Sequence, residues 1–466
     1  MLRNLLERPR KQHYRTRKTT IPTQMCMTMS QFLYGRKDQA KMMTTKSLYS
    51  DTMERRHDVD WLRVILFGLL IWFHFVVFYP YQPEGLIALP YYFIVSVMHQ
   101  WRLAALFVIS GMGTAFALRR RTWKQYVIER GSRLGLPLLF TVYILFFGIF
   151  EFTKKTTLLF TVFPGSEEMP YAHLWFVYNL LIYSIILTPF FFHIKANPEG
   201  LMMRMTRSAM NVRAGLGILI IPPIFLSING ILFKPWEFGE VGMWWEFPRY
   251  MIYFLLGFLM ISVRNEYFEA LDKIRISSSI LTPILAVSWF IVNTTSGIPD
   301  VMEGGWVDEG YPPFSFDATI ASVIQSFHAW FWCLLIFTWS SKLLNHPNKY
   351  LSYLNESVYP TYIVHMHVTI PMIVILAILG VGFFPAMIIA TPILIVGVLV
   401  CFEIVRRASL FRPFFGIKGG QEKVMQLFPF NSTQQKPLTV LFALFSHSLT
   451  LGMVIVLMLS LVILGG

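Results

Sequence analysis

Two ionisable side chains stand out in residues 56–80, RHDVDWLRVILFGLLIWFHFVVFYP. After Arg63 the segment is apolar up to residue 78, except for His74. These two residues are eleven positions apart, so in a helix they are separated by about three turns plus 20° and lie on one face, about 16 Å apart along the axis. Asp60 falls near the same stripe. The pattern therefore pairs a cation at the edge of an apolar helix with an imidazole inside it.

An ionisable group near the middle of a membrane is costly to bury, which makes function the default explanation of His74. Imidazole titrates near neutral pH, so His74 could take a proton from an attacking hydroxyl or carry an acyl group itself. A structural explanation stays open, in which Arg63 snorkels to the lipid headgroups and His74 hydrogen-bonds a neighbouring helix. No Ser-His-Asp arrangement is visible in the sequence.

The basic segment 119–133, RRRTWKQYVIERGSR, contains a second candidate site. The i, i+3 spacing of Arg130 and Arg133 directs two guanidiniums the same way. Guanidinium forks suit bidentate phosphate binding, so a phosphorylated cofactor or a lipid headgroup is the expected ligand. The other basic residues of this segment fit the excess of positive charge on the cytoplasmic side of membrane proteins.

A third candidate lies in YLNESVYPTYIVHMHVTI. His365 is about as deep in its apolar segment as His74 is in the first one, whereas His367 points about 200° away. We therefore expect His365 to face the centre of the protein. Pro360 is expected to loosen the helix near Tyr359 and to form a break that lines a cavity.

The segment AHLWFVYNLLIYS carries residues that suit the path of a polar acceptor. His173 and Asn179 are polar enough to line such a path, and we expect Trp175 to support it, although an interfacial aromatic belt also explains Trp175. The outer loops carry Trp236, Trp244, Trp245 and Trp306 among carboxylates, a mixture that suits stacking on sugar rings, and an interfacial belt explains these about as well. His99 and His328 are single polar residues within apolar segments, and we expect them to be structural.

The elements that must position these residues are membrane helices. The 466-residue chain has a mean hydropathy of +0.53 and is 55% hydrophobic, and several apolar stretches exceed the length that crosses a bilayer. We predict an all-α, polytopic transmembrane helical bundle of about 10–11 spans. The predicted spans are 62–80, 91–118, 134–152, 173–193, 214–233, 248–263, 277–296, 318–340, 357–379, 385–405 and 438–463.

The charge distribution predicts the orientation of the bundle. With the N-terminus in the cytoplasm, the cytoplasmic segments hold 35 of the 40 Lys and Arg residues. These segments are the tail through Arg63, 119–133, 195–213, 264–275, 341–356 and 406–437. Because the charges follow the spans, the net charge of +14 indicates a membrane protein and no nucleic-acid partner.

The chain divides into four expected parts. Residues 1–55 are basic, lack the apolar region of a signal peptide and are expected to be a disordered cytoplasmic tail, unless translation begins at a later Met such as Met53. A transmembrane domain is expected at 56–410, a cytoplasmic linker at 411–437 and an additional helix at 438–466. The three cysteines are scattered, so neither a disulfide framework nor a metal site is expected.

Five segments, in their order along the chain, resemble the acyltransferase 3 family of integral membrane enzymes. They are RRHDVDWLRVILFGLLIWFH, SGMGTAFALRRRTW, RGSRLGLPLLF, HLWFVYNLLIYS and LNESVYPTYIVHMHV. The similarity is strongest to the branch of glucan biosynthesis protein C type succinyltransferases. In that family an arginine or lysine is separated by ten residues from a histidine in the first span, as Arg63 and His74 are. Its paired-arginine motif matches Arg130 and Arg133. The eleventh span and the basic tail depart from the family's pattern of about ten spans.

The resemblance implies transfer of a succinyl or acetyl group from cytoplasmic acyl-CoA to a hydroxyl of an extracytoplasmic carbohydrate, such as a periplasmic glucan, at the bacterial inner membrane. Acyl-CoA is then the donor substrate, and no tightly bound cofactor or metal is expected. Arg130, Arg133 and Arg63 are expected to hold its phosphates. His365 is expected to orient His74, bind the carbonyl oxygen or relay a proton. The competing interpretation is a transporter or flippase for an acyl or glycan intermediate, which performs no chemistry.

Overall fold

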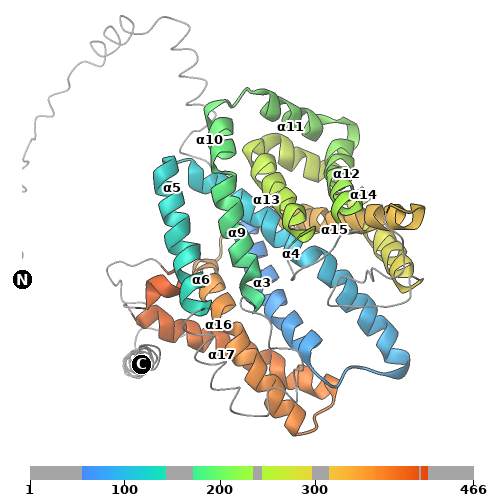
Figure 1. Cartoon of the computed structure of the whole chain (residues 1–466), viewed down its shortest axis with the longest axis vertical. Helices are drawn as coiled ribbons and strands as arrows, with labels where there is room; N and C mark the ends of the chain where they lie inside the picture. Colours follow the sequence, from blue (N-terminus) through green and yellow to red (C-terminus); the bar gives the residue numbers. More distant parts are fainter. Residues whose placement is uncertain (1–54, 143–171, 235–243, 296–313, 409–410, 418–466) are drawn as a thin grey trace, which may run out of the picture. The chain divides into compact units, whose positions relative to one another are not determined.

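A computed structural model of the chain describes residues 55–142, 172–234, 244–295, 314–408 and 411–417, and these residues contain helices and no strand (Figure 1). The long helices are α3 (His57–Phe78), α4 (Ala88–Leu118), α12 (Leu216–Phe233), α13 (Glu246–Ser262), α14 (Arg264–Thr295), α15 (Phe316–Leu343), α16 (Leu351–Ile378) and α17 (Phe383–Arg407). The shorter ones are α5 (Trp123–Arg130), α6 (Leu136–Phe140), α9 (Trp175–Ile186), α10 (Thr188–Ala196) and α11 (Leu201–Asn211). A π-helical turn, η2 (Gly131–Gly135), and the 3-10 turns η1 (Gly85–Ile87), η5 (Ala172–Leu174), η6 (Arg213–Gly215) and η8 (Arg412–Phe415) connect them.

Seven of the helices are long and apolar enough to cross a membrane, and the pair α9 and α10, bent by 48°, gives an eighth. This confirms the prediction of an all-α, polytopic membrane protein. Eight of the eleven predicted spans coincide with these helices. The predicted span 248–263 follows α13, which is 17 residues long and shorter than the others. The predicted span 438–463 lies outside the described residues, as does most of 134–152, so the predicted number of spans remains a prediction.

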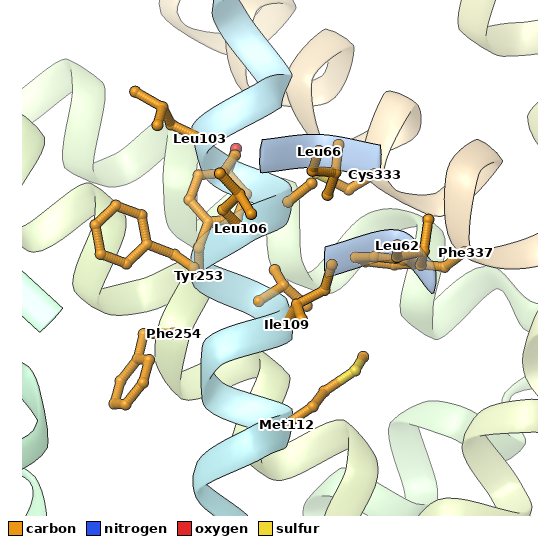
Figure 2. Close-up of a cluster of buried hydrophobic side chains, with 14 of the residues drawn as sticks. Leu62, Leu66, Leu103, Leu106, Ile109, Met112, Tyr253, Phe254, Cys333 and Phe337 are labelled. Carbon is orange, nitrogen blue, oxygen red and sulfur yellow. The ribbon is translucent and has the colours of Figure 1, made fainter. Parts of the chain in front are cut away.

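Helix α4 is the most buried of the candidate spans. In the most apolar 18-residue stretch of this span, 72% of the residues are buried inside the protein, compared with 28% for α14. Every residue from 103 to 109 is buried, which is the pattern of a helix surrounded on all sides. Figure 2 shows the side chains that pack around it. They come from α3 (Leu62 and Leu66), α13 (Tyr253 and Phe254) and α15 (Cys333 and Phe337).

Two glycines allow α4 and α13 to approach closely. A Cβ atom on Gly111 would collide with the Phe254 carbonyl oxygen, and one on Gly257 would collide with the Val108 carbonyl oxygen. Close backbone approach at small residues is a usual way for membrane helices to associate, because lipid provides no hydrophobic driving force between them. This contact fixes the position of α4 against α13.

Helix α3 is anchored near both ends. At its start, the His57 backbone N–H donates to Asn345 Oδ1 at 3.1 Å. Just after its end, the Tyr79 hydroxyl donates to the Val381 carbonyl in the turn between α16 and α17. Helix α16 continues through Pro360, so the break predicted there does not end the helix. The two helices that carry His74 and His365 are thus held side by side.

Candidate active site

His74 and His365 lie within hydrogen-bonding distance of each other. His74 Nδ1 is 3.2 Å from His365 Nε2, and the ring centroids are 5.1 Å apart. His365 is fully buried, whereas His74 keeps some accessible surface and stacks on Phe78. The sequence predicted that these two residues share the centre of the protein, and the structure brings them into direct contact.

The contacts of the two rings allow a tautomer to be assigned to each of them. His365 Nδ1 is 2.6 Å from the Tyr362 carbonyl oxygen, and a carbonyl can only accept, so His365 carries its proton on Nδ1. In the neutral ring His365 Nε2 is then an acceptor, and His74 Nδ1–H is the donor to it. His74 Nε2 is therefore left with a lone pair, the form that a general base needs.

His173, predicted to line an acceptor path, joins the histidine pair at the start of α9. Its ring lies edge-on to that of His365, with centroids 4.6 Å apart. The Tyr362 hydroxyl donates to the His173 carbonyl, so the tyrosine that holds His365 Nδ1 is itself held by the chain before α9. His173 lies in the turn η5, directly before the first residue of α9.

The other two residues of the predicted acceptor path lie on α9. Asn179 is fully buried, and Trp175 packs against Phe107 and Tyr250, with centroids 6.4 Å and 5.4 Å away. Trp175 is therefore a member of an aromatic cluster around α4, and its role on the acceptor path stays a prediction.

Arg63 and Asp60 bind the same residue of α16, which sequence reasoning missed. Arg63 Nη1 donates to Asn355 Oδ1 at 3.1 Å, and Asn355 Nδ2 donates to Asp60 Oδ1 at 2.7 Å. Arg63 Nη1 and Asp60 Oδ1 are 3.6 Å apart. Asn355 precedes His365 by ten residues in α16, much as Arg63 precedes His74 in α3, and that parallel spacing was the available signal. The same face of α3 thus meets α16 at two levels.

Arg130 and Arg133 contact different groups. Arg130 Nη2 donates to Thr114 Oγ1 of α4 at 3.2 Å, while Arg133 Nε is 3.4 Å from Glu129 Oε1. The π-helical turn η2 begins right after Arg130 and widens the turn, so the expected α-helical alignment of the two guanidiniums is not kept. Partial burial lowers the pKa of Arg133, and the nearby Glu129 carboxylate opposes that shift.

Arg63, Arg130 and Arg133 nevertheless form one positively charged group. The charge of Arg130 acts on both of the other arginines. Arg63 lies against Gly113, where an added Cβ would be 3.3 Å from its Nη2 atom, and Arg130 binds the next residue of α4. We call these three arginines the positive group. Guanidiniums clustered in this way suit an anion with several phosphates.

Arg102 was also missed by the sequence analysis. It is 2% exposed in the middle of α4, and its guanidinium carbon lies 3.5 Å from the centroid of the Phe73 ring. The signal was present, because Arg102 is the only charged residue in the predicted span 91–118. His99 and His328, expected to be structural, are in aromatic contacts with Phe73 and Trp289.

In the described part of the chain, no group of three or more His, Cys, Asp or Glu side chains is arranged to hold a metal ion. The histidine pair can instead accept a proton at His74 Nε2 and share the resulting charge with His365.

Comparison with known families gives one match. A family model described as an acyltransferase domain matches residues 56–406, which is most of the chain and includes every site residue described above. No curated protein and no solved structure matches this chain.

Proposed function

Because the chain belongs to the acyltransferase 3 family and is a membrane acyltransferase for groups other than aminoacyl groups, we propose that it transfers a succinyl or acetyl group from cytoplasmic acyl-CoA to a hydroxyl of an extracytoplasmic carbohydrate. A periplasmic glucan as acceptor and the bacterial inner membrane as location are parts of this proposal. The observation that carries it is the contact between His74 Nδ1 and His365 Nε2.

The positive group supports acyl-CoA as the donor. Arg130 and Arg133 lie at the end of α4 that the charge distribution assigns to the cytoplasm, and Arg63 lies near the start of α3 on the same side. Phosphates of CoA would bind these guanidiniums, and the pantetheine arm would extend along α3 toward His74. The eleven positions between Arg63 and His74 span about 16 Å in a helix, a length that an extended pantetheine arm can bridge.

The histidine pair supports the chemical step. His74 Nε2 takes the proton of the acceptor hydroxyl while the hydroxyl oxygen attacks the thioester carbonyl carbon. A C–O bond forms and the C–S bond breaks as the tetrahedral intermediate collapses. The thiolate of CoA then takes the proton back from His74, so the histidine ends the cycle neutral. In this scheme His365 is a positioning residue, because it accepts from His74 Nδ1–H and keeps Nε2 free.

The same nitrogen could instead attack the thioester and carry the acyl group. We propose direct transfer, in which the His74 ring is held at Nδ1 by His365 and stays in place during both proton transfers. A covalent acyl-histidine found by mass spectrometry of wild-type protein that is rapidly denatured at neutral pH would contradict direct transfer.

The experiment that tests the proposed function measures free thiol released from acyl-CoA by the purified protein, with and without a carbohydrate acceptor. An acyltransferase releases CoA in proportion to ester formed, whereas a transporter or flippase releases none. Mass spectrometry of cell-envelope glycans from a deletion strain identifies acyl group and acceptor together. Absence of CoA release with succinyl-CoA and with acetyl-CoA, in protein that is correctly inserted, would contradict the proposal.

A further inference from the structure

The side chain of Arg102 is buried in the membrane-spanning part of the protein, and no carboxylate of the described residues forms an ion pair with it. It is 2% exposed, and its Nε and Nη1 atoms have no hydrogen-bond partner among the residues that the structure describes. The Arg102 guanidinium carbon lies 3.5 Å from the centroid of the Phe73 ring, which is a cation–π contact. Such a contact offsets part of the desolvation of a guanidinium, but it leaves the hydrogen-bond donors unused.

A buried charge without a partner is strongly unfavourable, and membrane proteins keep such charges at functional positions. The guanidinium presents a planar set of donors that matches a carboxylate. The unused donors of Arg102 therefore point to an anionic group that is absent until substrate binds.

A second buried arginine strengthens the positive charge at this place. Arg249 of α13 is 5% exposed, and both arginines act electrostatically on Tyr250 and on His99. Arg249 has a carboxylate nearby, because Glu246 lies one turn earlier on α13 and acts on its charge. Of the two arginines, Arg102 is thus the one whose charge is not offset by a described carboxylate.

Arg102 is close to the histidine pair. The Phe73 ring lies 3.5 Å from the Arg102 guanidinium carbon and 6.4 Å from the centroid of the His74 ring. The charge of Arg102 acts on His74 as well. The sum of these two distances is the upper limit on the separation between the Arg102 guanidinium carbon and the centroid of the His74 ring.

We propose that Arg102 binds the free carboxylate of a dicarboxylic acyl group while the thioester carbonyl of that group lies at His74. The inference rests on the proposed function and decides between its two donors. In a four-carbon diacid the two terminal carbons are separated by about 4 Å, because three C–C bonds of about 1.5 Å connect them. A diacid of this length, with one hydrogen bond at each end, fits within the upper limit given above. An acetyl group has no free carboxylate to bind Arg102. The buried guanidinium therefore favours a succinyl-type donor over an acetyl donor.

The test compares succinyl-CoA with butyryl-CoA, which has the same number of acyl carbons and no carboxylate. The measured quantity is the ratio of the two kcat/KM values for CoA release on one preparation, so the fraction of folded protein cancels. We expect the wild-type protein to prefer succinyl-CoA by about 30-fold or more, since removing one partner of a buried charged hydrogen bond has an effect of that size. Arg102→Met is expected to abolish the preference, and Arg102→Lys to keep part of it.

The matched control is Arg204→Met, which removes a guanidinium from an exposed position of α11 and should keep the wild-type ratio. A wild-type protein that releases CoA equally well from both donors would overturn the inference and leave the proposed function standing. An unchanged ratio in Arg102→Met would also overturn it. If Arg102→Met does not fold, the Arg102→Lys ratio and the wild-type ratio decide. Failure to release CoA from either donor would count against the proposed function itself.

Discussion

The tautomer assigned to His74 depends on its contact with His365 and on a hydrogen bond with the backbone of Leu70. Tyr362 O accepts from His365 Nδ1–H, His365 Nε2 accepts from His74 Nδ1–H, and this order leaves the base free. Tyr362 is in turn held by the chain at His173. A rigid relay of this kind orients a general base without placing a carboxylate in the membrane interior.

Substitutions at His365 test the relay. In His365→Gln the amide oxygen can replace Nε2 as the acceptor for His74 Nδ1–H, so we expect most of the acyl transfer rate to remain. In His365→Leu the acceptor is lost, and a rate loss of about 100-fold is expected because general-base catalysis is worth at least that much. The measurement is the pH profile of kcat for CoA release in both variants. Equal losses in both would indicate a merely structural role for His365.

Substitution of Arg130 tests whether the positive group binds the phosphates of CoA. Arg130→Met should raise the KM for acyl-CoA about tenfold or more, the effect of losing one charged hydrogen bond, with a smaller change in kcat. Membrane insertion should not change. Arg204→Met removes an exposed cation of α11 and serves as the control that keeps the wild-type KM. An unchanged KM in Arg130→Met would show that CoA phosphates bind elsewhere.

At the scale of the helices, the periodicity of the sequence predicted correctly that Arg63 and His74 share one face of α3, but it missed Asn355 as the partner of Arg63. The eleven-residue spacing placed Arg63 and His74 on one face of α3, and both contact α16. Asn355 was missed because its importance depends on which helix packs opposite it, and the ten-residue spacing to His365 does not by itself show that Asn355 faces α3. The π-helical turn after Arg130 was missed because it inserts one residue into an otherwise ordinary helical pattern.

The close approach of α4 and α13 predicts the effect of a single methyl group. Gly257→Ala places a Cβ against the Val108 carbonyl, so the helices must separate, and overpacking of this kind lowers stability by about 1–3 kcal/mol. Gly68→Ala is the matched control, because a Cβ there meets nothing within 4 Å, and alanine favours helix by up to about 1 kcal/mol. Thermal unfolding in detergent should show a lower Tm for Gly257→Ala than for Gly68→Ala. A reversed order would contradict the described contact.

For the whole molecule, composition and hydropathy were sufficient to predict an all-α membrane protein. They could not predict the bend of 48° between α9 and α10, because an apolar segment of that length has the same hydropathy whether its helix is straight or bent. The position of Arg102 over the Phe73 ring could not be predicted either, because it requires two helices to be placed together.

The predicted orientation can be measured on the intact membrane. In a protein whose Cys26, Cys333 and Cys401 are replaced by Ser, one new cysteine is introduced at Leu86, which is 97% exposed in η1, or at the exposed Lys124 of α5. A maleimide that does not cross membranes should label Leu86→Cys in spheroplasts, and Lys124→Cys only after permeabilisation. Labelling in the opposite order would reverse the assignment of the donor side.

The most direct test of the whole account is CoA release by His74→Gln. Glutamine has nearly the length of histidine but cannot take a proton, so the variant should insert, fold and bind acyl-CoA like the wild-type protein. We expect its kcat for acyl transfer to fall by about 100-fold to 10,000-fold, the range attributed to general-base catalysis. A variant that binds acyl-CoA normally and keeps most of the wild-type kcat would contradict the claim that His74 Nε2 removes the proton of the acceptor.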